Sequence, residues 1–213
     1  MAKEQKDADK LGVMPTHFFG ENDKIGLNVP LFVGRRTDGL DQRTIPLINN
    51  YDCYIPNWIK GEEKRFRFWK VVGRSLAKSR GEKYCINVFR DFYWSNLYRI
   101  NYRQQGIDTP ASLRSKQINI CAQLLLAEID ELNPSVSIFL TGINECKQKG
   151  VGRFWKHWQS CNQLKNLDNQ NNSFTLIGES GKEHHCFAFH CPERKNNEAV
   201  IEKISEILKI YKG

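Results

Sequence analysis

Short hydrophobic runs alternate along this chain with longer segments whose hydrophobic positions recur at helical spacing. The short runs predict buried strands within 28–33, 87–97, 136–140, 174–177 and 186–189. The helical spacing predicts helices over 66–79, 112–132, 152–164 and 197–211. Because strands and helices alternate, we expect an α/β fold with three α/β/α layers around a central, mainly parallel sheet.

Four of the hydrophobic runs stop at small, polar or chemically reactive residues. They read FVGRRTDG at 32–39, YWSNL at 93–97, IFLTG at 138–142 and FHCP at 189–192. Open α/β sheets bind ligands at the carboxyl ends of their strands. We therefore expect the four segments to contribute to one shared site.

The composition favours one folded domain. Forty per cent of the 213 residues are hydrophobic, which is enough for a substantial core. We expect residues 1–13 to form a flexible polar leader and residues 14–213 to form a single domain. The sequence contains no hydrophobic run as long as a membrane span, and its charged N-terminus does not resemble a secretory signal. We expect a cytoplasmic protein with no membrane partner.

The formal net charge of +8 favours a polyanionic partner such as DNA, although a basic surplus also serves solubility. Basic residues are concentrated in one stretch: Lys60, Lys64, Arg65, Arg67, Lys70, Arg74, Lys78 and Arg80. Arg194 and Lys195 directly follow the last motif. We interpret these residues as a rim that follows nucleic-acid phosphates, with Arg194 and Lys195 among the residues that bind the nucleic acid.

The seven cysteines form no C-x-x-C pair, so zinc ribbons and iron–sulfur clusters lack their usual spacing. One alternative is a metal site formed by Cys186 and Cys191 with the neighbouring His184, His185 and His190. Reduced, mostly buried thiols are the preferred interpretation.

In the order of its four motifs the chain resembles the uracil-DNA glycosylase superfamily. The nearest resemblance is to a bacterial branch with Val-Gly-x-x-Thr-x-Gly in the first motif and Trp-Ser-Asn-Leu in the second. It extends from about residue 29 to residue 195. The resemblance implies a uracil-DNA glycosylase-like fold and a monofunctional DNA glycosylase that flips out its target base. It implies no cofactor, and we expect a monomer.

The resemblance also implies roles for individual residues. His190 corresponds to the histidine that donates to the carbonyl oxygen of the base, although Cys191 here separates it from Pro192. Asn96 corresponds to the amide that reads the edge of a pyrimidine. The full set of predicted substrate-binding residues is Gly34, Arg35, Arg36, Thr37, Gly39, Tyr51, Tyr54, Ser95, Asn96 and Thr141. Tyr51 and Tyr54 are the candidates for stacking on the flipped base, and Phe92 and Tyr93 are the alternatives.

The first motif departs from the superfamily pattern. Arg36 occupies the position that often holds the residue that orients the attacking water. Asp38 is the nearest carboxylate and our candidate for that catalytic role. Two alternatives remain: another group positions the water, or Asp38 only forms a turn with Gly39 in a non-catalytic DNA-binding relative.

The same motif bears on the substrate. Enzymes strict for uracil carry a bulky aromatic residue here, whereas this chain has Asp38-Gly39-Leu40. We therefore expect a more open pocket that accepts a pyrimidine enlarged at carbon five. Because some members of the superfamily excise glucosylated hydroxymethylcytosine from phage DNA as antiviral defence, the resemblance suggests this base as the specific hypothesis. A uracil-type repair glycosylase and a small-molecule hydrolase that uses Asp38 and His190 are the competing hypotheses.

Overall fold

The structure of the chain is a computed structural model. It describes residues 11–13, 17–19, 29–34, 67–102, 111–141, 143–144, 149–150, 152–168, 172–190, 192 and 197–211.

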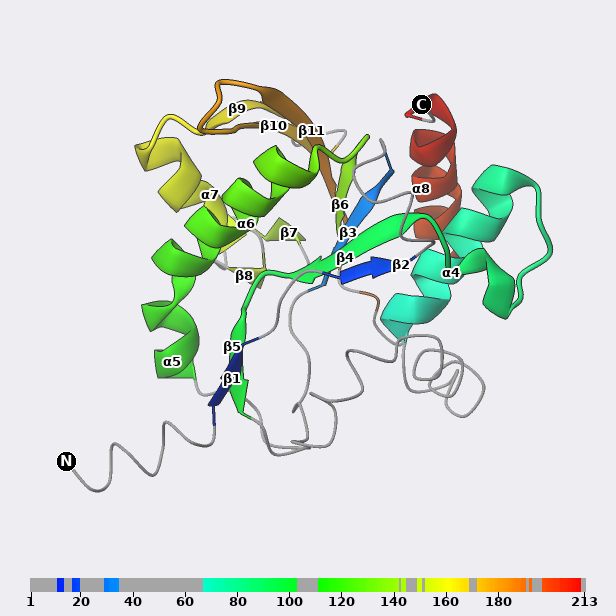
Figure 1. Cartoon of the computed structure of the whole chain (residues 1–213), viewed down its shortest axis with the longest axis horizontal. Helices are drawn as coiled ribbons and strands as arrows, with labels where there is room; N and C mark the ends of the chain where they lie inside the picture. Colours follow the sequence, from blue (N-terminus) through cyan, green and yellow to red (C-terminus); the bar gives the residue numbers. More distant parts are fainter. Residues whose placement is uncertain are drawn as a thin grey trace.

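Within the described residues, seven strands form one sheet in the spatial order β2-β4-β3-β6-β11-β10-β9 (Figure 1). The bounds are β2 His17–Phe19, β3 Leu31–Gly34, β4 Phe92–Asn96, β6 Ser137–Phe139, β9 Leu164–Asp168, β10 Ser173–Ile177 and β11 Glu183–Ala188. The four central strands, β4, β3, β6 and β11, are parallel. Antiparallel pairing joins β2 to one side of this group, and β10 followed by β9 to the other. The mainly parallel sheet predicted from the sequence is confirmed at its centre.

Helices cover both faces of the sheet (Figure 1). Helices α4 (Arg67–Arg80) and α8 (Glu198–Ile210) pack against each other on one face. Helices α6 (Ile118–Leu132) and α7 (Gly152–Ser160) lie on the opposite face, and the short α5 (Ala111–Lys116) leads into α6. The mixed α/β class expected from the alternating pattern is therefore correct.

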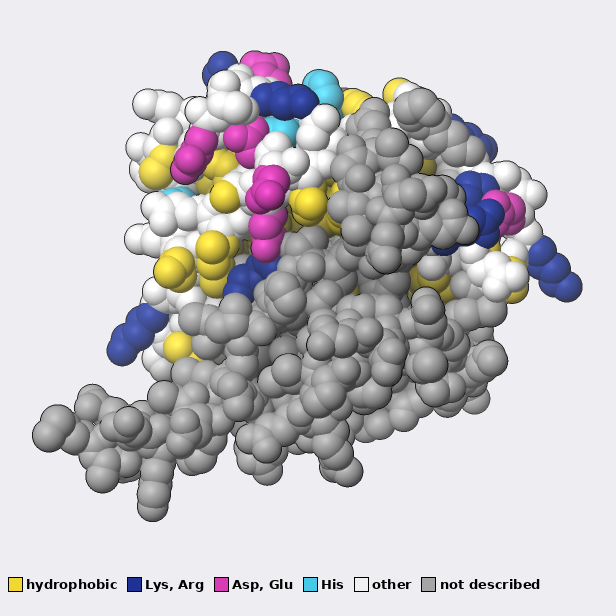
Figure 2. All heavy atoms as spheres, viewed as in Figure 1, with side chains coloured by type: hydrophobic (Ala, Val, Ile, Leu, Met, Phe, Trp, Pro, Cys, Tyr) yellow, Lys and Arg dark blue, Asp and Glu magenta, His cyan; other side chains and the backbone are white. Residues whose placement is uncertain are grey.

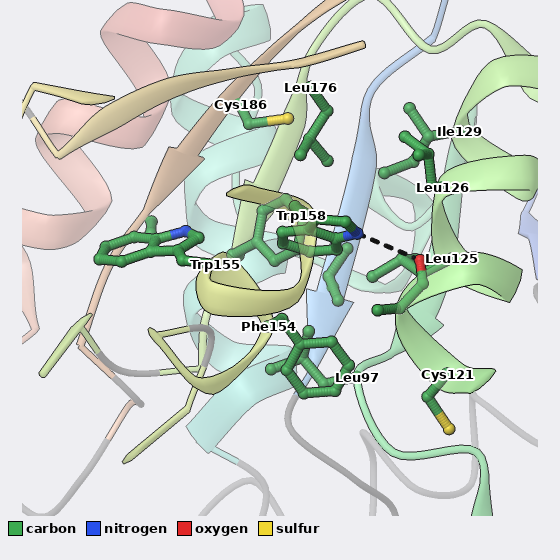
Figure 3. Close-up of a cluster of buried hydrophobic side chains, with 14 of the residues drawn as sticks. Leu97, Cys121, Leu125, Leu126, Ile129, Phe154, Trp155, Trp158, Leu176 and Cys186 are labelled. Carbon is green, nitrogen blue, oxygen red and sulfur yellow. Dashed lines mark hydrogen bonds between the residues drawn. The ribbon is translucent and has the colours of Figure 1, made fainter. Parts of the chain in front are cut away.

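Each face of the sheet has its own hydrophobic core because side chains alternate along every strand. Phe32 and Ile138 face α4 and α8, whereas Phe139 faces α6 and α7. In the second core the indole N–H of Trp158 donates to the carbonyl oxygen of Ala122 at 3.2 Å, which joins α7 to α6 (Figure 3). The indole N–H of a buried Trp usually has such a partner, because it is the only polar atom of the side chain.

Two predicted elements are divided in the structure. The helix expected over 112–132 is interrupted at Gln117, so that α5 and α6 meet there. Only the second half of 87–97 is a strand, because a 3-10 turn (η2, Ile86–Val88) comes first and Asp91 then takes a left-handed φ of 54°. That conformation interrupts extended backbone, so β4 begins after it.

Helix α7 is shorter than predicted. It ends at Ser160, and Asn162 follows with a φ of 56°. Residues Leu164–Asp168 then form the edge strand β9, where we expected the end of a helix and a loop. By contrast, α6 ends where the sequence predicts: Asn133, with a φ of 45°, caps it before Pro134.

In the described part of the chain, two further pairs of short strands lie outside the main sheet. β1 (Leu11–Val13) pairs with β5 (Ile100–Tyr102), and β7 (Ile143–Asn144) pairs with β8 (Lys149–Gly150). The last three residues of the segment assigned to the leader are thus part of β1. Among the described residues, no helix has the length and hydrophobicity needed to cross a membrane.

Candidate functional site

The parallel centre of the sheet brings the four sequence motifs to one edge. Because β4, β3, β6 and β11 run in the same direction, their carboxyl ends lie side by side. Asn96 ends β4 and pairs with Gly34 at the end of β3. Thr141 and His190 each come two residues after their strands, β6 and β11. The order along the edge is therefore Asn96, Gly34, Thr141 and His190.

Backbone hydrogen bonds extend this alignment beyond the strands themselves. The Leu97 N–H donates to the Gly34 carbonyl at 2.9 Å, and the Leu140 N–H donates to the Val33 carbonyl at 2.9 Å. The Phe189 N–H donates in the same way to Phe139, at 2.8 Å. The residues next to these donors are consequently held close to the sheet edge.

The strand order reverses between β3 and β6. From β3 the chain passes through α4 to β4 on one side, and from β4 it returns through α6, past β3, to β6 on the other. Ligands of open α/β sheets bind at such a reversal, outside the carboxyl ends of the strands. Gly34 and Thr141 flank this point, so the topology alone identifies it as the candidate site.

Gly34 and Asn96 fit each other closely. A Cβ atom placed on Gly34 would lie 2.4 Å from Oδ1 of Asn96 and 3.4 Å from the Phe68 ring. Asn96 is only 1% exposed, so its amide has little room to move away. Glycine at position 34 is therefore what allows the Asn96 side chain to lie over the end of β3.

The other two strand ends differ in exposure. The Thr141 side chain is buried, and its hydroxyl has no hydrogen-bond partner among the described residues. Buried hydroxyls are normally paired, so an unpaired one at a strand end is a candidate ligand contact. The His190 side chain is exposed at the far end of the row.

Ser95 faces the opposite side of the sheet from Asn96. Its hydroxyl lies 3.5 Å from Oε2 of Glu128 in α6, and the same oxygen pairs with the guanidinium of Arg99. Burial lowers the pKa of Arg99 to about 10. The structure thus brings Ser95 together with an ion pair that the sequence did not indicate.

The predicted basic rim is only partly available for a partner. Arg74 pairs with Glu198 and Lys78 pairs with Glu202, while Arg80 donates to the carbonyls of Val88 and Arg90. Figure 2 shows basic side chains next to acidic ones on the right of the view, and separate basic side chains on the left near α5.

Arg67 and Lys70 form no ion pair within the described part of the chain. They lie in the first turn of α4, which carries no acidic residue. Since α4 runs back from the carboxyl end of β3, this turn begins near the candidate site, where the helix dipole also favours anions.

Among the described residues, the histidines and Cys186 near the last motif do not form a metal-binding cluster. His184 and Cys186 are buried beneath α6 and α7, whereas His185 is exposed on the other face beside Tyr211. Nε2 of His184 lies 3.1 Å from Oδ1 of Asp130. In the part of the chain that the structure describes, no three potential ligands come together.

Several predicted site residues lie outside the described residues. They are Arg35, Arg36, Thr37, Asp38, Gly39, Tyr51, Tyr54, Arg194, Lys195 and Cys191. Their roles stay predictions.

Sequence reasoning did not identify Phe68 or Glu128 as site residues. Phe68 has helical spacing with core residues, so its position predicts simple packing; in the structure it is half-buried and lies against Gly34. Glu128 is 33 positions from Ser95, and no local pattern joins them.

No protein-family model matches the chain, and no curated protein matches it.

Proposed function

We propose that this chain is a monofunctional DNA glycosylase with a uracil-DNA glycosylase-like fold. The observation that carries the proposal is the distribution of side chains along the carboxyl edge. Asn96 and His190 occupy the outer positions, and the smaller Gly34 and Thr141 lie between them. With neighbouring strands about 4.8 Å apart, the strands that carry the outer two residues are separated by roughly 14 Å along the sheet edge, a span on the scale of one flipped pyrimidine nucleotide.

The chemistry requires each of these residue types. When the bond between C1′ and the base nitrogen breaks, its electron pair leaves with the base, and water adds to C1′. His190 donates a hydrogen bond to the base oxygen that gains negative charge. Asn96 presents both a donor and an acceptor to the base edge. We assign the orientation of water to Asp38, on the resemblance of the first motif alone.

Phe68 completes the proposed base site. Its ring lies against Gly34 and is only partly covered by the core. An aromatic face next to the Asn96 amide suits stacking on the flipped base, which contributes about 1–3 kcal/mol per base. Arg67 and Lys70, one on either side of Phe68 in the first turn of α4, are positioned for the flanking phosphates.

For the substrate we propose a pyrimidine enlarged at carbon five. The support is the Asp38-Gly39-Leu40 segment, which lacks the aromatic residue of uracil-specific relatives. Glucosylated hydroxymethylcytosine in phage DNA is the specific candidate, and its excision would serve antiviral defence in the cytoplasm. A monomer is sufficient, because all four strand ends come from one chain. Uracil-type repair is the alternative that the experiment must separate.

The test is base release measured by mass spectrometry. The protein is incubated with uracil-containing DNA, with unmodified DNA and with phage DNA that carries glucosylated hydroxymethylcytosine. We expect release of the glucosylated base alone, reduced by about 10²–10³-fold in His190→Ala because one donor to the leaving base is lost.

His185→Ala is the matched control. It removes an exposed histidine from the preceding strand, beside Tyr211 and on the face of α8. Its activity should equal that of the wild type. Release of uracil alone would change the proposed substrate. DNA binding without release of any base would favour the non-catalytic relative and contradict the proposed activity.

A further inference from the structure

An ion pair between a buried arginine and a partly exposed glutamate lies behind the end of β4, on the face of the sheet away from Asn96. The Arg99 side chain is 2% exposed and contacts the carboxylate of Glu128 in α6. Burial lowers the pKa of Arg99 to about 10, which still leaves the guanidinium charged at neutral pH. A buried cation requires a paired anion, and among the described residues Glu128 supplies a carboxylate in contact with it.

The same carboxylate oxygen also reaches Ser95. The Ser95 hydroxyl lies 3.5 Å from Oε2 of Glu128, so one side chain of α6 contacts residues on both sides of Asn96 in the sequence. Between them, the Leu97 N–H donates to the Gly34 carbonyl at 2.9 Å. The segment from Ser95 to Arg99 is therefore attached to α6 at two points and to β3 at a third.

Ser95 directly precedes Asn96 in β4, so its contact with α6 bears on the direction of the Asn96 side chain. Successive side chains of a strand point to opposite faces, so fixing Ser95 against α6 directs Asn96 toward Gly34 and Phe68. The fit at Gly34 is close enough that a small rotation of β4 would move the amide from its place over β3.

We propose that Glu128 is a positioning residue, which acts through Ser95 and Arg99 to hold the Asn96 amide toward the ligand at the carboxyl edge. The identity of that ligand rests on the proposed function. The placement of Asn96 does not, so the two can be tested separately.

The first test is NMR of the Asn96 side-chain amide, whose signals are identified by their loss in Asn96→Asp. We expect Glu128→Gln to shift or broaden these signals, and Ser95→Ala to produce a smaller change. Glu131→Gln is the matched control, an exposed glutamate on the same helix, and should leave them unchanged. If Glu128→Gln does not fold, Ser95→Ala, which removes one hydroxyl, decides the matter. Asn96 signals identical to the wild type in the folded variants would overturn the proposal.

The second test is a double-mutant cycle on base release. We expect Glu128→Gln to lower kcat/KM about 10–100-fold, since a small misplacement of a binding group has effects of that size. In an Asn96→Ala background the same change should lower it less than about threefold, because both act through one amide. If Glu128→Gln lowers kcat/KM by the same factor in the wild type and in Asn96→Ala, the result would contradict the positioning role. If the wild type releases no base but Glu128→Gln still shifts or broadens the Asn96 amide signals, the proposed function fails and the positioning role is supported.

Discussion

Replacement of Gly34 by alanine tests the close fit at the centre of the candidate site. The new Cβ would lie 2.4 Å from Oδ1 of Asn96, whereas real Cβ contacts are essentially never shorter than 3.0 Å. The amide or the end of β3 must therefore move by at least about 0.6 Å, and by about 1 Å to reach an ordinary contact. Since Asn96 is 1% exposed, neither can move without disturbing its neighbours.

Two effects of different size follow from this displacement. Overpacking of a buried position destabilises a protein by about 1–3 kcal/mol, which corresponds to a loss of about 2–4 °C in Tm per kcal/mol for a domain of this length. Displacement of a substrate-binding group by about 1 Å lowers activity by about 10²-fold. We therefore expect Gly34→Ala to remain folded and to lose most of its base release.

The assay is a double-mutant cycle of Gly34→Ala and Asn96→Ala, in which the free energy of unfolding of each variant is measured with urea. Once the Asn96 amide is absent, the nearest remaining atom to the new Cβ is in the Phe68 ring at 3.4 Å, an ordinary contact. Gly34→Ala should then cost less than about 0.5 kcal/mol, although it costs about 1–3 kcal/mol in the wild type.

Equal destabilisation in both backgrounds would show that the clash is not with Asn96 and would refute the reasoning. Full stability of Gly34→Ala in the wild-type background would refute it as well. Both results concern the free energy of unfolding, so they stand whether or not the chain is a glycosylase.

Two further predictions concern a hydrogen-bonded carboxylate and the proposed stacking ring. The Ser180 hydroxyl, at 2.7 Å, is the main cause of the lowered pKa of Asp130. Because the folded pKa lies below the unfolded value of about 3.9, this stabilisation is present above that pH and is lost as the pH falls through the folded pKa. Urea unfolding should therefore show Asp130→Ala to be about 1–3 kcal/mol less stable at neutral pH, with a difference that narrows below about pH 4; a constant difference would contradict this account. Phe68→Leu, which keeps a hydrophobic side chain, should retain the fold and lower base release by about 10-fold or more; unchanged kinetics would exclude stacking.

The sequence was most informative where one pattern determines both an element and its burial. Helix α8 has hydrophobic residues at helical spacing, and Ile201, Ile204 and Leu208 are buried as that spacing requires. The run at 136–140 is hydrophobic except for Ser137, which is typical of a strand covered on both sides, and it contains β6 at the centre of the sheet.

The sequence was least informative about elements that depend on a distant partner. β9 contains Lys165 and Asn166, both exposed, and Asn166 has a left-handed φ of 51°. Such residues disfavour a strand locally, so β9 exists because β10 offers it hydrogen-bonding groups. β2 is likewise only three residues long and is defined by its pairing with β4.

The candidate site shows the same division between features set by local sequence patterns and features set by distant contacts. By itself the sequence determined which residues end the strands, because each hydrophobic run stops at a small or polar residue such as Gly34, Asn96 or Thr141. Only the tertiary structure decided their order along the edge, the fit of Asn96 against Gly34, and the contact of Glu128 with both Ser95 and Arg99. The physical reason is range: hydrophobic periodicity is a property of adjacent residues, whereas strand order and side-chain contacts across the sheet depend on the packing of segments far apart in the chain.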